Sequence, residues 1–454
     1  MPSPPRLSPP RRHVEGPHRS LGPWRPTAAQ VRAVGLTAAG AFVAVIGRRP
    51  DLLVIVTPLA VAALWGHVAR PRVEARAKAA LTESTLREGA ATALVVTIEP
   101  DDPAGDGALG DVDGLVTLAR TAWDERSPDH GVAWLGGAGR DRCTIGVRSL
   151  RWGIRPLGTT AVTLTSAWGA YRAGPVELPP MSTTTLPLPA IFEARAPTPH
   201  PRGLVGLNRS ARPGSGSEFN TIRQFQPGDR LRRIHWPVSL RTGQLHVTST
   251  YADEDAHVFL LVDAFSDLGP REGIDGRPTS LDVTVRAAGA ISEHFLRSGD
   301  RLTLRTVGAA HVPALGVGSG TRHLRRVLET LARITPASER RDDGTRDIRG
   351  VDPMSLALVL TPLVEPAMVE LAHTLASRGM ATVVVDTFPP HLTENPTDVY
   401  QALAWRIRLL SRESQVHGLV TRGIPVVPWR GPGSLDHVLR DIARRAGAPR
   451  MVRR

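Results

Sequence analysis

The residues best equipped for chemistry lie in one short stretch of the chain, from Gly214 to Trp236, with Arg241 just beyond it. Its Pro-Gly-Asp run is typical of a turn, because glycine reaches unusual dihedral angles and an aspartate side chain accepts hydrogen bonds from nearby N–H groups. Opposite charges in the stretch can pair, and Phe225 and Trp236 can pack as apolar anchors. The candidate residues are Gly214, Gly216, Glu218, Phe219, Arg223, Pro227, Gly228, Asp229, Arg233, Trp236 and Arg241.

These residue types suit two roles. One is catalysis by the charged groups, and the other is a charge-paired, aromatic-pinned docking of this hairpin onto a neighbouring domain. We favour docking, since it uses the same residues and needs no substrate.

The remaining catalytic patterns are poorly supported. Lys78 is the single lysine among 56 basic residues, and it stands in an alanine-rich context that matches neither a phosphate-binding P-loop nor a Schiff-base site. Cys143 is the single cysteine, so an internal disulfide and a cysteine-rich metal site are excluded. Ser217 follows Gly214-Ser-Gly in a linker and not on a strand-to-helix elbow. We therefore expect no enzymatic activity.

Strands alternate with longer amphipathic segments beyond residue 250. The predicted strands are 257–263, 301–307, 356–361, 381–386 and 424–427, and the predicted helices are 280–296, 322–334, 367–377, 400–418 and 434–446. This order predicts a mostly parallel sheet covered by helices on both faces. Ligands of such sheets bind beyond the carboxyl ends of the strands, so Asp263, Thr361 and Asp386 are the positions of interest.

The region 72–197 has a different sequence pattern. Short alternating apolar stretches, such as 93–98, 143–147 and 161–165, are separated by Gly, Pro and Asp, and this spacing favours a β-sandwich-like domain. Residues 198–250 then form a linker and the candidate segment described above, followed by the α/β domain at 251–454.

The positive charge is concentrated near the amino end. Residues 1–78 carry 12 basic and three acidic side chains, whereas the rest of the chain carries 44 basic and 40 acidic ones. Because basic and acidic side chains are nearly equal in number after residue 78, we expect no basic face that would bind DNA or RNA, and hence no nucleic-acid partner.

Two apolar runs, 33–47 and 52–69, lie within this basic part. They predict two transmembrane helices over 28–69 after a flexible basic leader at 1–27. A pair of buried core helices is the alternative, and a signal peptide fits poorly because a second apolar run follows at once. Arginines flank both outer ends, so we expect a two-span protein of the cell membrane whose soluble domains are cytoplasmic.

The run from Gly214 to Arg241 resembles the signature of the bacterial domain-of-unknown-function 58 (DUF58) family: Gly-x-Gly-x-Glu-Phe, Arg-x-Tyr-x-x-Gly-Asp, Arg-x-Ile-x-Trp and Ala-Arg. Phe225 stands for the Tyr, and Leu240-Arg241 stands for the Ala-Arg. The resemblance extends to the layout, and it implies that the C-terminal α/β domain is von Willebrand factor A-like, a Rossmann-like fold.

The resemblance also implies a possible metal site. In related domains a strand-ending Asp-x-Ser-x-Ser holds a divalent ion, whereas this chain has Asp263, Phe265 and Asp267, with Thr361 at the later supporting position. Phe265 offers no oxygen ligand. Two expectations stay open: Mg²⁺ held by Asp263, Asp267 and Thr361, or a metal-free docking surface with no cofactor.

The function implied by the resemblance is that of a membrane-anchored, non-enzymatic adaptor. Its expected partners are the lipid bilayer and a MoxR-type AAA+ ATPase, which would supply the nucleotide chemistry that this chain lacks. The alternative is a cell-envelope scaffold protein that acts without an ATPase.

Overall fold

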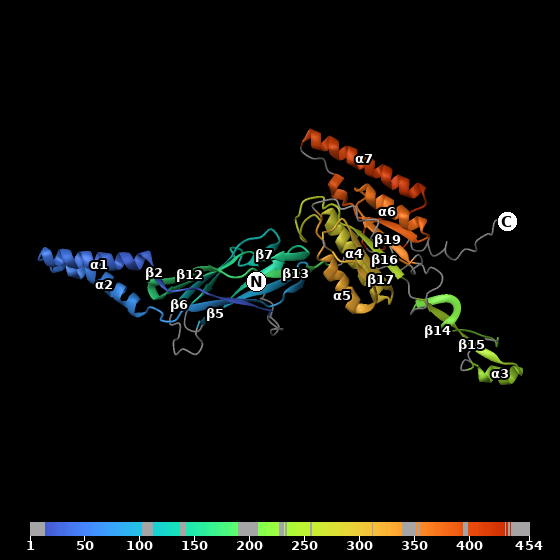
Figure 1. The fold of residues 1–454 in the computed structure, drawn as a ribbon, viewed down its shortest axis with the longest axis horizontal. Coiled ribbons are helices and arrows are strands. Elements are labelled where there is room, and N and C mark those ends of the chain that lie inside the picture. Colours follow the sequence, from blue (N-terminus) through green and yellow to red (C-terminus); the bar gives the residue numbers. More distant parts are fainter. Residues whose placement is uncertain are drawn as a thin grey trace, which may run out of the picture. The chain divides into compact units, whose positions relative to one another are not determined.

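The computed structural model describes most of the 454 residues, in two compact units, Met1–Thr185 and Leu186–Arg454 (Figure 1). The described residues are 14–101, 112–136, 142–188, 208–226, 231, 234–254, 257–310, 312–337, 351–352, 355–393, 398–431, 433–434 and 436. Side chains are described for these residues except 14–17, 208–220, 249–254 and 393.

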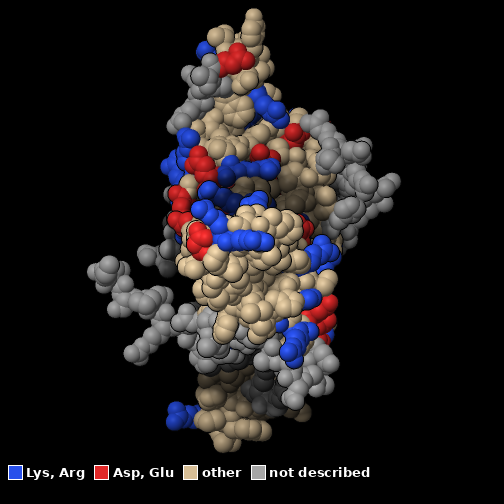
Figure 2. Space-filling view, turned by 90° about the vertical axis from the view of Figure 1, so that its left-hand side faces the viewer, with Lys and Arg blue, Asp and Glu red and all other residues tan. Residues whose placement is uncertain are grey.

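Two antiparallel helices, α1 (Ala28–Ile46) and α2 (Asp51–Val68), form a hairpin in the first unit. The Thr27 side chain caps α1 by accepting a hydrogen bond from the N–H of Gln30 at 3.3 Å. Both helices are long and apolar enough to cross a membrane, yet only 11% of each is buried. The predicted pair of apolar helices is confirmed, and among the described residues neither helix is buried as a core helix would be. Figure 2 faces the end where α1 and α2 lie, and the surface in its centre is largely free of charged side chains.

The rest of the first unit consists of antiparallel sheets, with strand orders β1-β3-β5-β9-β7, β2-β12-β11-β6-β8 and β10-β13-β4. The two five-stranded sheets share one hydrophobic core, because alternate residues of β3, β5 and β9 meet alternate residues of β6 and β11. The strands are β1 (Val14–Ser20), β2 (Arg25–Pro26), β3 (Ala75–Leu81), β4 (Thr85–Arg87), β5 (Ala91–Pro100), β6 (Val112–Leu118), β7 (Asp124–Ser127), β8 (Val132–Leu135), β9 (Arg142–Ser149), β10 (Gly153–Pro156), β11 (Thr160–Ser166), β12 (Tyr171–Glu177) and β13 (Ser182–Leu186).

Part of the predicted flexible leader is structured. Val14–Ser20 pairs with β3, Arg25–Pro26 pairs with β12, and residues 1–13 lie outside the described residues. The prediction missed two apolar anchors in this segment, since Leu21 and Trp24 are buried in the shared core. The chain therefore contributes strands to this core both before and after the helical hairpin.

A long two-stranded ribbon begins the described part of the second unit. It pairs β14 (Asn208–Gln224) with β15 (His246–Glu254), and the short helix α3 (Trp236–Thr242) precedes β15. The ladder breaks between Gly214 and Phe219, both of which oppose Thr250. The residues predicted as linker and signature thus include a strand.

A six-stranded sheet of order β18-β17-β16-β19-β20-β21 forms the body of the second unit. Its strands are β16 (His257–Asp263), β17 (Arg301–Val307), β18 (Leu315–Gly318), β19 (Leu356–Thr361), β20 (Ala381–Asp386) and β21 (Val426–Pro428). Five are parallel and β18 is antiparallel, so the predicted mostly parallel sheet is confirmed. β18 was not among the predicted strands, because a short edge strand has too few apolar residues to show a period.

Helices cover both faces of this sheet. Phe259 and Leu261 of β16 share a core with Leu371 and Leu375 of α6. The alternate strand residues, such as Leu260, are equally buried on the opposite face, where α4 contacts β16, β17 and β19. The helices are α4 (Ser280–Arg297), α5 (Gly320–Leu331), α6 (Pro366–Ser377) and α7 (Val399–Thr421). They match the predicted helices to within a few residues, and most of the predicted helix 434–446 lies outside the described residues.

Candidate functional site

The strand order of the large sheet reverses between β16 and β19, and this is where ligands of doubly wound sheets bind. β16 ends at Asp263 and β19 ends at Thr361, so these two residues of the predicted site lie at this switch point. The Thr361 hydroxyl donates a hydrogen bond to Asp263 Oδ2 at 2.6 Å, and the Phe265 N–H donates to Asp263 Oδ1 at 3.0 Å. Both carboxylate oxygens are thus engaged by the protein itself.

Burial controls the chemistry of this carboxyl group. Asp263 is 2% exposed. Desolvation raises the pKa of Asp263 to about 6, while the hydrogen bonds from Thr361 and Phe265 act in the opposite direction. Thr361 in turn accepts a hydrogen bond from the Leu363 N–H at 2.9 Å, and Leu363 has a φ of 55°, in the left-handed region. The Asp263 carboxyl group is thus fixed in position by hydrogen bonds and shielded from solvent.

The surroundings of Asp263 do not fit a Mg²⁺ ion, which requires near-octahedral oxygen ligands. Phe265 packs against Gly308, where a β-carbon would lie 2.5 Å from the ring, so an aromatic side chain occupies the side toward β17. Asp267 Oδ2 pairs with Arg271 Nε at 3.1 Å. In the part of the chain that the structure describes, no three His, Cys, Asp or Glu side chains are grouped as metal ligands.

Asp386, at the end of β20, belongs to a second cluster at the same sheet edge. Its carboxylate accepts a hydrogen bond from the Phe388 N–H at 3.0 Å and pairs with Arg412 of α7. The Arg412 guanidinium donates to Pro362 O at 2.9 Å and lies 4.5 Å from the centre of the Phe388 ring, which stacks on Trp405. The sequence pointed to Asp386, but Arg412 was missed because 26 residues separate the partners.

This cluster fixes one face of α7 and leaves the other without a partner among the described residues. From Tyr400 on, the residues facing outward recur at intervals of three or four, and Val399 precedes Leu403 by four, which places all of them on one side of the helix. We call them the α7 outer face: Val399, Tyr400, Leu403, Ile407 and Leu410, all exposed. Exposed apolar side chains thus form a continuous row along this side of α7.

The signature residues that the structure describes lie on the ribbon. Trp236 and Leu240 of α3 are 59% and 80% exposed, so the indole does not act as a buried anchor. Arg241 also lies on α3, and the Arg223 guanidinium donates a hydrogen bond to Gln224 O at 3.2 Å. Gly214, Gly216, Glu218 and Phe219 are placed by their backbone only, and Pro227, Gly228, Asp229 and Arg233 lie outside the described residues.

The two histidines of this segment have structural contacts. The His235 N–H donates to His246 O at 2.8 Å, and His235 Nδ1 accepts a hydrogen bond from the Val238 N–H at 3.4 Å. Ser239 links the same elements, because its hydroxyl oxygen accepts from the His246 N–H at 2.9 Å. These contacts hold α3 against the start of β15.

Comparison with known proteins relates the chain to proteins of unknown function. Residues 221–404 match the family described as "Protein of unknown function DUF58". Uncharacterised proteins of Mycobacterium bovis and Mycobacterium tuberculosis are 31% identical over 180 residues, which is 39% of this chain. The chain spans about half, 49%, of the length of these curated relatives.

Two solved structures show only distant likeness. The cupredoxin domain of amoB from Nitrosocaldus yellowstonii has a TM-score of 0.15 and 12% identity, covering 26% of this chain and 89% of that one. The adhesin InvE of Yersinia pseudotuberculosis has a TM-score of 0.15 and 7% identity, covering 25% of this chain and 40% of that one. Likeness at this level carries no argument about fold or function.

Proposed function

We propose that this protein is a membrane-anchored adaptor that binds other proteins through its α/β unit and catalyses no reaction. The observation that carries the proposal is the α7 outer face, an exposed apolar row, whereas the other helices packed on the same sheet, such as α4 and α6, bury their apolar sides. Such a row loses contact with water when a partner covers it. The carboxylates at the sheet edge are engaged by Thr361 and Arg412, which suits a docking surface.

The proposed anchor is the α1–α2 hairpin. Its apolar side chains are exposed almost throughout, and in water this would be unfavourable by about 25 cal/mol per Å² of apolar surface. A bilayer removes that cost. We propose that both ends of the hairpin face the cytoplasm, as the flanking arginines favour.

The α/β unit is proposed to be von Willebrand factor A-like. Its strands, counted within the sheet, follow the order 3-2-1-4-5-6, with the antiparallel β18 at one edge. The proposed partner is a MoxR-type AAA+ ATPase, on the strength of the family resemblance. The second candidate is a cell-envelope scaffold that needs no ATPase.

Capture experiments separate these functions. The tagged full chain is purified from detergent-solubilised membranes with and without ATP, alongside Ile407→Asp and the control Gln401→Asp. Both positions are exposed on α7, but only Ile407 belongs to the outer face. We expect ATP-dependent capture of an AAA+ protein by the wild type and the control, and at least about tenfold less by Ile407→Asp, since a charge buried in an apolar interface is strongly unfavourable.

Nucleotide-independent capture of other envelope proteins would favour the scaffold. Equal capture by Ile407→Asp and the wild type would contradict the role of the α7 outer face. Turnover of a small molecule by the purified chain alone would contradict the non-enzymatic proposal.

A further inference from the structure

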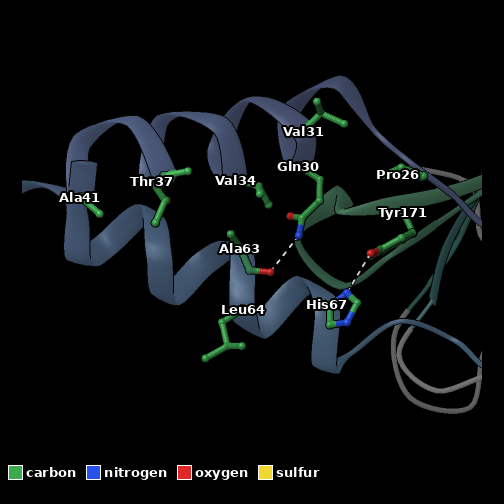
Figure 3. Close-up of a pocket in the computed structure, with 11 residues that line it drawn as sticks. Pro26, Gln30, Val31, Val34, Thr37, Ala41, Ala63, Leu64, His67 and Tyr171 are labelled. Atoms are coloured by element: carbon green, nitrogen blue, oxygen red, sulfur yellow. Dashed lines mark hydrogen bonds between the residues drawn. The ribbon is translucent and has the colours of Figure 1, made fainter. Parts of the chain in front are cut away.

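A groove runs along the α1–α2 hairpin at the end where the hairpin joins the β-sheets (Figure 3). Its volume of about 620 Å³ lies within the range of small-molecule sites, about 300–1,000 Å³. The α1 side consists of Val31, Val34, Thr37, Ala38 and Ala41, and Leu64 contributes from α2. The Thr37 hydroxyl donates a hydrogen bond to Ala33 O of its own helix at 2.7 Å, and the rest of this stretch is apolar.

Two close helix contacts fix the width of the groove. A β-carbon at Gly40 would lie 2.4 Å from Val56 Cγ2, which brings the helices together near the connecting turn. Toward the other end, the Gln30 side-chain amide donates to Ala63 O at 2.8 Å, across the base of the groove (Figure 3). The hairpin is thus pinned at both ends, and the space between these contacts is built into the packing.

The end of the groove nearest the sheets is polar and cationic. Tyr171, which is buried, forms a hydrogen bond with His67 at 3.1 Å (Figure 3). The Arg70 guanidinium lies 5.2 Å from the centre of the Tyr171 ring. Arg25 and Arg32 belong to β2 and the start of α1 at this same end, and both are exposed.

We propose that this groove binds one acyl chain of an anionic phospholipid, with the headgroup near Arg70 and Tyr171. The apolar stretch suits a hydrocarbon chain, and the arginines at its end suit a phosphate-bearing headgroup without a compensating positive charge. Aromatic and basic side chains at the level where a helix leaves the bilayer favour the same placement. The inference rests on the proposed membrane anchoring of the hairpin, and it specifies that the hairpin binds one anionic phospholipid.

The test is retention of lipid by the delipidated full chain in detergent, measured by native mass spectrometry with phosphatidylglycerol or phosphatidylcholine. Val34→Trp fills the groove, and Val43→Trp is the matched control, because Val34 and Val43 are 51% and 55% exposed on opposite sides of α1. We expect one retained phosphatidylglycerol in the wild type and in Val43→Trp, and loss of it in Val34→Trp. Arg70→Gln should lower retention of phosphatidylglycerol about fivefold and leave phosphatidylcholine unchanged.

Equal retention by Val34→Trp and Val43→Trp would overturn the proposal, as would equal retention of the two lipids by the wild type. Ala38→Phe fills the groove from a second position, so the test does not depend on one variant folding. A doubled protein mass without lipid would show that a second copy of the chain fills the groove, and this would also overturn it. Membrane fractionation separates the two proposals: a wild type that alkaline carbonate releases from membranes contradicts the anchor itself.

Discussion

At the scale of single residues, Asp263 bears a charge where burial opposes it. The folded-state pKa of about 6 is above the ordinary value of 3.8 for an aspartate, so the folded chain binds the proton more tightly than the unfolded chain. The stability that this proton contributes is fully present below about pH 3.8 and is lost as the pH rises through about 6. Above that range the ionised group relies on Thr361 and Phe265.

Asp263→Asn should therefore gain stability relative to the wild type as the pH rises from 4 to 7, by up to about 3 kcal/mol, because asparagine keeps a similar shape without the charge. The measurement is the free energy of unfolding by urea at several pH values in that range. Asp263→Ala, which removes the hydrogen-bond acceptors, is the control and should be less stable throughout. If the difference in free energy of unfolding between Asp263→Asn and the wild type does not change with pH, this explanation is wrong.

Burial also affects Cys143, whose thiol reactivity can be measured directly. It lies in β9 within the shared core, and desolvation raises the pKa of its thiol to about 11. Since the thiolate is the reactive form, we expect no reaction with a maleimide at pH 7 while the chain is folded, and full reaction in denaturant. Rapid labelling of the folded protein would show that the core around β9 opens.

At the scale of elements, Gly158 determines how the chain passes from β10 to β11. A β-carbon there would lie 1.8 Å from the carbonyl oxygen of Ala119, which is backbone and cannot rotate away. We expect Gly158→Ala to lower the free energy of unfolding of the first unit by about 3 kcal/mol. Gly316→Ala is the control, since nothing lies within 4 Å of its added carbon and its φ is not in the left-handed region. Denaturation followed by tryptophan fluorescence measures both.

The sequence predicted the elements better than their contacts. Periods of 3.6 and 2 residues are local, so the α/β elements and the two apolar helices were found from short windows. The pairing of Val14–Ser20 with β3 was missed, because a strand of polar residues at a sheet edge has no such period. The Asp386–Arg412 pair and the exposure of Trp236 were also missed, since both depend on how elements pack.

At the scale of the whole molecule, the proposed topology places residues 48–50 outside the cytoplasm and residue 72 inside. We expect Arg49→Cys in a Cys143→Ser background to react with an impermeant maleimide in intact cells, and Arg72→Cys to react only after lysis. Arg49 lies in the turn between α1 and α2, and Arg72 follows α2. The reverse pattern would place the soluble domains on the other side of the membrane.

The join between the hairpin and the sheets has a mechanical consequence. Only six residues separate Val68 from Ala75, and Thr27 and Tyr171 bridge the two parts by hydrogen bonds, while Trp24 donates a hydrogen bond to Val73 O in the connecting segment. Under the proposed anchoring, the sheets of the first unit cannot rotate freely relative to the membrane, because no flexible linker separates them from the hairpin. The sheets of the first unit would keep a fixed angle to the bilayer normal. A change in bilayer thickness or lateral tension that tilts the hairpin would therefore exert a torque on these sheets.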